Sequence, residues 1–193
     1  MNAGMDARVQ QAFERIRRED FLPPSQRKNA GLNVALPIGY EQTNSQPLTV
    51  AIMLQLLDVQ PGYKVLDVGS GSGWTSALIG WLVGEAGKVV AVDVIPELVR
   101  QSRQNLRKYD LPQVQVHQAQ PGIIGWPPEV AYERILVSAA GKSLPDELVR
   151  QLAGGGRMVL PIQNDLWLIT KNADGSIKRQ KYPGFVFVPL VEN

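Results

Sequence analysis

The sequence contains no cysteine and only one histidine, His117, among its 193 residues. Without cysteine the chain can form neither disulfide bonds nor a thiolate nucleophile, and it cannot bind a metal through cysteine ligands. A single histidine argues strongly against a multi-histidine metal site, although it still permits a Ser-His-Asp triad. We therefore predict that the protein has no metal site.

Long apolar runs and a strong excess of charge are also lacking. The net charge is +2, and no apolar run approaches the roughly 20 residues of a membrane span. The first twenty residues lack the apolar core of a signal peptide. Two small basic clusters, "RKYD" and "KRQK", have no pattern of flanking aromatic residues, which favours a solvated surface over nucleic-acid binding. We expect a cytoplasmic protein that binds neither membranes nor nucleic acids.

Predicted strands and helices alternate along most of the chain. The predicted strands are "KVLDVG" (64–69), "KVVAVDV" (88–94), "VQVH" (114–117), "RILVSAA" (134–140), the end of "GGGRMVLPI" (154–162) and "FVFVPLV" (185–191). The predicted helices are 5–18, "PLTVAIMLQLLDV" (47–59), "WTSALIGWLVG" (74–84), "PELVRQSRQNLRKY" (96–109) and "PDELVRQLA" (145–153). This alternation predicts an α/β fold with a doubly wound, mostly parallel sheet. A hairpin around Asp174-Gly175 predicts an antiparallel C-terminal edge.

A glycine-rich segment, "VLDVGSGSGW" (65–74), follows the first strand of this alternation. Its glycines allow a tight turn and a close approach of a ligand to the backbone. Asp93 ends the second strand, where an acid can accept hydrogen bonds from ribose hydroxyls. A dinucleotide fingerprint would need a third glycine at Trp74. The pattern from Asp67, D-x-G-x-G-x-G, is instead the one that S-adenosylmethionine-dependent methyltransferases carry; the alternative is a structural turn in an unrelated α/β domain.

A further motif, "LPIGYEQTNSQP" (36–47), gives the sequence a resemblance to the protein-L-isoaspartate O-methyltransferase family. That family's pattern is close to P-L-P-I-G-x-x-Q-T-I-S-x-P, followed by D-x-G-x-G-S-G. "RVQQAFERIRREDFLP" (8–23), "AYERILVSAA" (131–140), "LVRQLAGGGRMVLPI" (148–162) and "FVFVPLV" are similar to its other motifs. The resemblance therefore covers nearly the whole chain, in order.

The resemblance implies a Rossmann-like methyltransferase fold and S-adenosylmethionine as cofactor. It also implies methylation of the free carboxylate of L-isoaspartyl residues in damaged proteins and peptides; the ester collapses to a succinimide, which can reopen as normal aspartate. The resemblance also implies a monomer. We expect a single domain, 1–193, because no linker separates two parts. Residues 1–60 would form a helical segment that covers substrate and cofactor, and 61–193 the sheet core.

The site residues follow from the motifs. The resemblance implies that Ser45 is catalytic and that Thr43 matches the family's threonine. The alternative is that the side chain of Ser45 or Gln46 caps the helix that begins near Pro47. The predicted cofactor-binding residues are Asp67, Gly69, Ser70, Gly71, Asp93, Val94, Gln120 and Gly122. We predict a structural or solvent-facing role for His117, because an ionised carboxylate needs no general base.

Two positions depart from the family pattern. Asn44 stands where the family has isoleucine, and it either changes the fit of the substrate or faces solvent. Pro121 stands where the family has an aspartate that contacts the adenine amino group. Proline offers no side-chain acceptor, so Gln120 or Gln118 would supply this contact; the alternative is a weaker affinity for the cofactor. These departures leave open a related methyltransferase with another carboxylate substrate, or a member that binds cofactor or a partner without catalysis.

Overall fold

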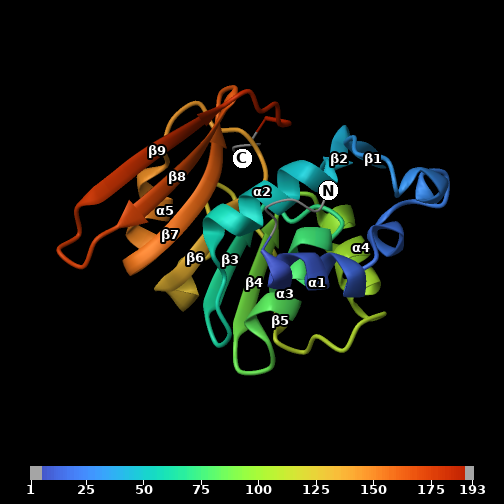
Figure 1. Ribbon diagram of the computed structural model, residues 1–193, viewed down its shortest axis with the longest axis horizontal. Helices are drawn as coiled ribbons and strands as arrows, with labels where there is room; N and C mark the ends of the chain where they lie inside the picture. The colour runs from blue at the N-terminus through green and yellow to red at the C-terminus, as the bar shows by residue number, and fades with distance from the viewer. Residues whose placement is uncertain (1–5, 190–193) are drawn as a thin grey trace.

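A computed structural model describes residues 6–189 as an α/β fold built around one large sheet (Figure 1). In this part of the chain the sheet has seven strands, in the spatial order β5-β4-β3-β6-β7-β8-β9. They are β3 Lys64–Val68, β4 Lys88–Asp93, β5 Val114–Gln118, β6 Tyr132–Val137, β7 Leu152–Ile162, β8 Asp165–Lys171 and β9 Ile177–Pro183. Strands β3 to β7 pair in parallel, whereas β8 and β9 pair antiparallel. The predicted doubly wound, mostly parallel sheet with an antiparallel C-terminal edge is confirmed.

The parallel strands are short apolar runs because both faces of this part of the sheet are covered. Successive side chains of a strand point to opposite faces. Val65 and Val89 therefore join the hydrophobic cluster on one face, and Leu66 and Val90 join the cluster on the other.

Helices lie against both faces of the sheet (Figure 1). One cluster receives side chains from α1 Ala7–Arg15, α2 Pro47–Leu57, α3 Trp74–Val83 and α4 Pro96–Leu106. The other receives them from α5 Asp146–Gln151 and from the connection that contains η3 Pro127–Glu129. Strands β4 and β5 lie on one side of β3, and β6 and β7 on the other. The winding of the chain thus reverses at β3, and α/β sheets bind ligands at the carboxyl ends of the strands at such a point.

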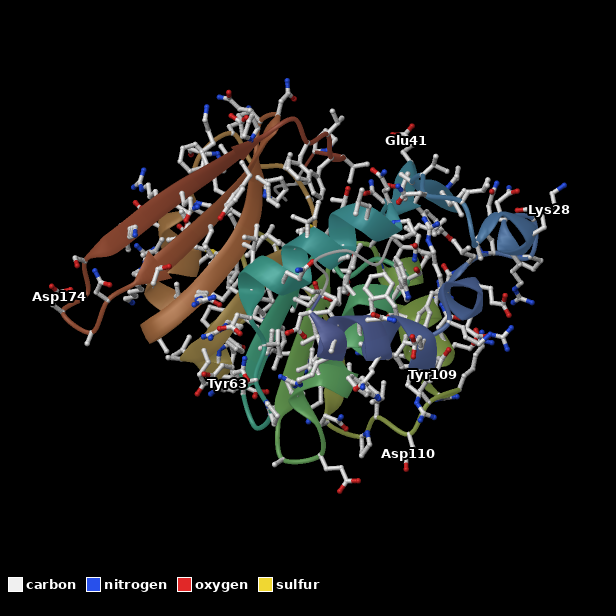
Figure 2. The ribbon with its side chains drawn as sticks, viewed as in Figure 1. Lys28, Glu41, Tyr63, Tyr109, Asp110 and Asp174 are labelled. Carbon is white, nitrogen blue, oxygen red and sulfur yellow. The ribbon has the colours of Figure 1, made fainter. Side chains whose placement is uncertain are left out.

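The motif at 36–47 forms a small hairpin that the sequence analysis did not predict. Strand β1 Leu36–Gly39 pairs antiparallel with β2 Gln42–Asn44. The turn residues Tyr40 and Glu41 have φ angles of 54° and 59°, as the central residues of a type I′ turn require. Glu41 points away from the protein at this tip (Figure 2). The hairpin leads directly into α2, and two short 3₁₀ helices, η1 Arg18–Phe21 and η2 Arg27–Asn29, precede it.

The predicted strand at 185–191 is wrong over its described residues. Strand β9 ends at Pro183, and Gly184 turns the chain with a φ of 90°. Residues 185–188 form no strand, and Pro189 makes only an isolated bridge to Ala140. The Ala140 N–H donates to the Val188 carbonyl at 2.8 Å. This contact brings the end of the described chain to the carboxyl end of β6; residues 190 and 191 lie outside the described part.

The helix predicted at 145–153 is present but ends two residues early, and the glycine turn predicted after it is wrong. Helix α5 ends at Gln151, and β7 begins at Leu152 without an intervening turn. The glycines at 154–156 lie inside β7, where the register with β6 shifts. Gly155, with a φ of 80°, allows this bulge.

Two helices end three residues before their predicted ends, and α2 and α3 end within two residues of theirs. Asp6 caps α1 through its side chain, which accepts from the N–H groups of Arg8 and Val9, and α1 ends at Arg15 instead of reaching residue 18. The predicted start of α1, Met5, lies outside the described residues. Helix α4 ends at Leu106 and not at Tyr109.

Candidate active site

A cavity of about 280 Å³ opens at the carboxyl ends of the parallel strands, near the lower end of the range of roughly 300–1,000 Å³ for small-molecule sites. Its walls come from segments that are distant in the sequence: 42–45, 68–72, 74–75, 92–95, 119–120, 122–125, 138–139 and 188–189. The connections after β3, β4, β5 and β6 therefore meet the end of the N-terminal hairpin at one place. Ser138, Ala139, Val188 and Pro189 were not predicted as site residues, although they lie within motifs quoted for the resemblance.

The glycine loop folds tightly against the end of β4. The N–H groups of Gly69 and Ser70 both donate to the Val92 carbonyl, at 2.9 and 3.1 Å. Gly73 has a φ of 91°, and a Cβ atom there would lie 2.4 Å from the Ser102 hydroxyl oxygen of α4. Glycine is required at this position by both the backbone conformation and the close packing.

Asp93 fastens the glycine loop from the end of β4. Its side chain is buried; Oδ2 accepts from the Gly71 N–H at 2.8 Å and Oδ1 from the Ile95 N–H at 3.0 Å. Burial raises the pKa of this carboxyl, and the backbone hydrogen bonds oppose the rise. Because an ionised carboxylate offers about four acceptor positions, Asp93 keeps capacity for ligand hydroxyls on the cavity wall.

The end of the hairpin forms another part of the cavity wall, next to this loop. Thr43 and Ser45 both line the cavity and are half-buried. The alternative in which Ser45 or Gln46 caps α2 is wrong: Gln46 occupies the N-cap position, yet its side chain makes no capping hydrogen bond within residues 6–189. The Leu48 N–H donates instead to Asn33 Oδ1 at 3.0 Å. The Ser45 hydroxyl is therefore not engaged as a helix cap.

Known proteins of one family are similar to this chain over nearly its whole length. A sequence model of the protein-L-isoaspartate(D-aspartate) O-methyltransferase family matches residues 2–193. The protein-L-isoaspartate O-methyltransferase of Methanopyrus kandleri is 43% identical over 188 residues, which cover 95% of this chain and 83% of that one. That of Aeropyrum pernix is 46% identical and covers 95% and 72% of the two chains.

This chain belongs to the protein-L-isoaspartate(D-aspartate) O-methyltransferase family.

Solved structures show the same fold. A protein-L-isoaspartate O-methyltransferase structure superposes with a TM-score of 0.88 at 25% identity; this chain is covered to 98% and spans 63% of that chain. A Plasmodium falciparum structure, titled as a putative member of the family in complex with S-adenosyl-L-homocysteine, gives a TM-score of 0.86 at 23% identity. It covers 97% of this chain and 92% of its own.

Asn44, the first departure from the pattern of the isoaspartate methyltransferase family, is buried, so the alternative in which it faces solvent is wrong. Only 4% of the residue is exposed. Its Oδ1 accepts from Arg18 Nε at 2.7 Å, and its Nδ2 donates to the Ser72 hydroxyl at 3.3 Å. Neither Arg18 nor Ser72 was predicted as a site residue. Both lie inside segments that the resemblance uses, Arg18 in the motif at 8–23 and Ser72 in the glycine loop, but neither segment indicates by itself that the two side chains meet at Asn44.

The second departure from the family pattern, Pro121, lies between two residues of the cavity wall. Gln120 and Gly122 both line the cavity, together with Ile123 and Ile124. In the described structure neither Gln118 nor Pro121 belongs to the lining. Of the two glutamines considered as replacements for the family's adenine-binding aspartate, only Gln120 is therefore placed to contact a ligand.

Asp67, the first residue of the family's glycine motif, lies behind the loop and not on its surface. It is fully buried, and its Oδ2 accepts from the hydroxyls of Thr75 at 2.9 Å and Ser76 at 2.6 Å. Burial is the main reason that its pKa rises to about 6. Within residues 6–189 the cavity lining does not include Asp67, so it holds the first turn of α3 onto β3.

The remaining predicted residues fall into two groups. Ser70 and Val94 line the cavity, as do Gly69 and Gly71. His117 stacks on Trp126 with ring centroids 4.3 Å apart, burial lowers its pKa, and in the described part of the chain it is outside the cavity lining.

Proposed function

We propose that this protein transfers a methyl group from S-adenosylmethionine to the free carboxylate of L-isoaspartyl residues in damaged proteins and peptides, and so starts their repair. The observation that carries the proposal is the meeting of the glycine loop with Thr43 and Ser45 on the walls of one cavity. Family membership over residues 2–193 supplies the substrate class.

The cavity offers the groups that S-adenosylmethionine needs. Asp93 has acceptor capacity for ribose hydroxyls, and Val94, Ile123 and Ile124 supply apolar surface suited to an adenine ring. The Ser70 hydroxyl is buried on the cavity wall without a hydrogen-bond partner among the described residues. Such an unsatisfied group is costly unless a ligand or water completes it, which supports a polar ligand at this position.

The chemistry requires positioning more than acid-base catalysis. When bound, the cofactor supplies an electrophilic methyl group on a sulfonium, and its leaving group departs neutral. A substrate carboxylate with a pKa of about 4 is already ionised near pH 7 and needs no general base. Ser45 and Thr43 are proposed to hold that carboxylate through their hydroxyls at near-attack distance. The reaction also requires that the bound substrate and cofactor exclude water, which would otherwise solvate the nucleophile.

A labelling experiment tests this function. The protein is incubated with methyl-labelled S-adenosylmethionine and two peptides that differ only in aspartate or isoaspartate at one position. We expect label in the isoaspartyl peptide alone. Label in the aspartyl peptide would indicate a methyltransferase for another carboxylate. If calorimetry shows cofactor binding but neither peptide is labelled, the protein is a family member without catalysis. If calorimetry shows no cofactor binding, the proposal that the protein is an enzyme fails.

The N-terminal segment and the sheet pack into one unit. We propose a single domain over 1–193, in which residues 1–60 cover the substrate and the cofactor. Its support is that Val9 of α1 and Leu54 of α2 share one hydrophobic cluster with Val65 and Val159 of the sheet. Monomeric state, cytoplasmic location and absence of nucleic-acid binding stay predictions from the sequence. Across residues 6–189, no helix combines the length and apolarity needed to cross a bilayer.

A further inference from the structure

Arg18 is a buried cation without an acidic partner in the described part of the chain. Only 6% of it is exposed, and none of the ion pairs formed within residues 6–189 includes it. Burial lowers its pKa to about 10, so the guanidinium stays charged at neutral pH. It also lies over the ring of Trp74, 5.3 Å from the centroid. A buried charge is retained only where many hydrogen bonds replace its hydration, and its partners therefore indicate what Arg18 holds.

The partners of Arg18 lie on two segments, residues 30–34 and residues 44–45, of which the second lines the cavity. Its Nη1 and Nη2 groups donate to the carbonyls of Ala30, Leu32 and Val34 at 3.3, 2.9 and 2.7 Å. Nη2 also donates to the carbonyls of Asn44 at 3.1 Å and Ser45 at 2.9 Å. The planar guanidinium, with five N–H donors, suits such a set. It holds the carbonyls of Asn44 and Ser45, which flank the Ser45 N–Cα bond, and so restrains the direction in which the Cα–Cβ bond of Ser45 points.

The Asn44 side chain extends this arrangement to the glycine loop. Its oxygen accepts from Arg18 Nε at 2.7 Å, and its amide nitrogen donates to the Ser72 hydroxyl at 3.3 Å. Ser72 is itself fixed, because its carbonyl accepts from Asn105 Nδ2 of α4 at 3.1 Å. An amide side chain has both an acceptor and a donor, so Asn44 can satisfy both neighbours at once. An aliphatic side chain there would leave the Arg18 Nε–H without its partner.

We propose that Arg18 and Asn44 are positioning residues that set the register of Ser45 against the cofactor loop, through a bridge formed by Arg18, Asn44 and Ser72. The proposal rests on the proposed function, which assigns the acceptor carboxylate to Ser45 and the methyl donor to the loop. The bridge sets how these two parts of the site are spaced. A small misplacement of two reacting groups lowers the rate far more than it lowers the affinity for either.

The main test compares Asn44→Leu with Asn44→Asp. Leucine is similar in size and removes both hydrogen bonds. Aspartate keeps the acceptor for Arg18 and accepts from the rotatable Ser72 hydroxyl. We expect Asn44→Leu to lower kcat for an isoaspartyl peptide by about 10- to 100-fold, with the calorimetric Kd of S-adenosyl-L-homocysteine within about threefold of the original. Asn44→Asp should restore most of kcat. Unchanged kcat in Asn44→Leu would overturn the proposal.

Arg8→Gln is the matched control for a general loss of stability. Arg8 also ties a helix to backbone carbonyls, those of Val59 at 3.0 Å and Leu82 at 2.6 Å, on segments that do not contribute to the cavity walls within residues 6–189. We expect it to lower Tm and leave kcat unchanged. If Arg8→Gln lowers kcat as much as Asn44→Leu at a similar Tm, the effect is one of stability and the proposal fails.

The Ser72→Ala variant keeps the test decisive should Asn44→Leu fold poorly. It removes only the loop end of the bridge and leaves the bonds of Arg18 in place. By itself it should lower kcat as Asn44→Leu does, and its effect on kcat should differ between the original and the Asn44→Asp background if residues 44 and 72 act through one bridge. Independent, additive effects on kcat in this cycle would contradict the bridge.

Hydrogen exchange separates this proposal from the proposed function, because it needs no turnover. Saturating S-adenosyl-L-homocysteine should protect the amides of residues 42–46 as well as those of the glycine loop. In Asn44→Leu the loop should remain protected by the ligand, whereas residues 42–46 should lose that response. An unaltered response of residues 42–46 would overturn the bridge even if no peptide is methylated, and loss of labelling with an intact exchange pattern would overturn only the proposed function.

Discussion

Gln118 and Gln120 are close in the sequence, but only one of them lines the cavity of the described structure. Gln120 follows β5 and lines the cavity, whereas Gln118 is the last residue of β5 and stays outside the described lining. Asp93 and Asp67 differ in the same way: Asp93 reaches the cavity wall, whereas Asp67 is enclosed behind the loop with its carboxylate on two hydroxyls. In each pair the residue type is the same, and the position in the fold decides what it can contact.

We expect Gln120→Ala to weaken the binding of S-adenosyl-L-homocysteine by roughly fivefold, the effect of losing one hydrogen bond of about 1 kcal/mol. Gln118→Ala is the matched control and should bind as the original protein does. Calorimetric titration of both variants measures the difference. Equal affinities for Gln120→Ala and the original protein would remove Gln120 from the adenine contact, and a loss confined to Gln118→Ala would assign that contact to the other glutamine.

The start of helix α2 is set by its own proline and is capped by a residue of another segment. Pro47 at the first helical position predicts the start of the helix correctly, because its missing N–H would be unpaired there in any case. The capping side chain comes from Asn33, which is 15 positions away from the Leu48 N–H that it accepts. This leaves Ser45 free to face the cavity. The start of one element is therefore stabilised by a segment that packs beside it.

Asn33→Ala should lower the free energy of unfolding by about 1 kcal/mol, as expected for the loss of a helix cap. Ser45→Ala should change it by less than about 0.5 kcal/mol, because the Ser45 side chain does not cap the helix. Urea denaturation of both variants gives the two values. A larger loss of stability in Ser45→Ala than in Asn33→Ala would contradict the assignment of the cap.

At the scale of the whole molecule, the N-terminal helices and the sheet share one core. Phe21 of η1 and Leu57 of α2 are fully buried in the same cluster as Leu136 of β6 and Val159 of β7. Because these segments share one core, neither the N-terminal helices nor the sheet can unfold without exposing apolar surface of the other. Unfolding should therefore be cooperative. The seven-stranded sheet of the described chain holds the cavity at the point where its winding reverses.

We therefore expect a single cooperative thermal transition, with calorimetric and van't Hoff enthalpies that agree. Leu54→Ala, which removes a buried side chain between α2 and the sheet cluster, should shift that transition to lower temperature by an amount that corresponds to about 2–5 kcal/mol. Scanning calorimetry of both proteins checks this. A separate early transition for residues 1–60 would contradict the single domain.

Most of the sheet could be predicted from the sequence, because short apolar runs separated by turn residues are local signals. Those signals were misleading where a contact outside the segment decides the structure. Residues 185–188 have a strand-like composition, yet Gly184 turns the chain away and Ala140 holds it beside β6. The hairpin at 36–44 was missed because its strands are very short and its turn residues, Tyr40 and Glu41, are not typical of a turn with positive φ angles.

The sequence by itself determined the glycine loop, the acid at the end of β4 and the family, because these depend on residue order within continuous segments. The motif at 36–47 also predicted Thr43 and Ser45 as site residues, and their roles stay predictions. Only the tertiary structure decided that Asn44 is buried, that Arg18 is its partner, that Asn33 caps α2 and that Asp67 lies behind the loop. Each of these depends on hydrogen bonds between segments, and a buried polar group takes whichever partner the packing of the chain brings within reach.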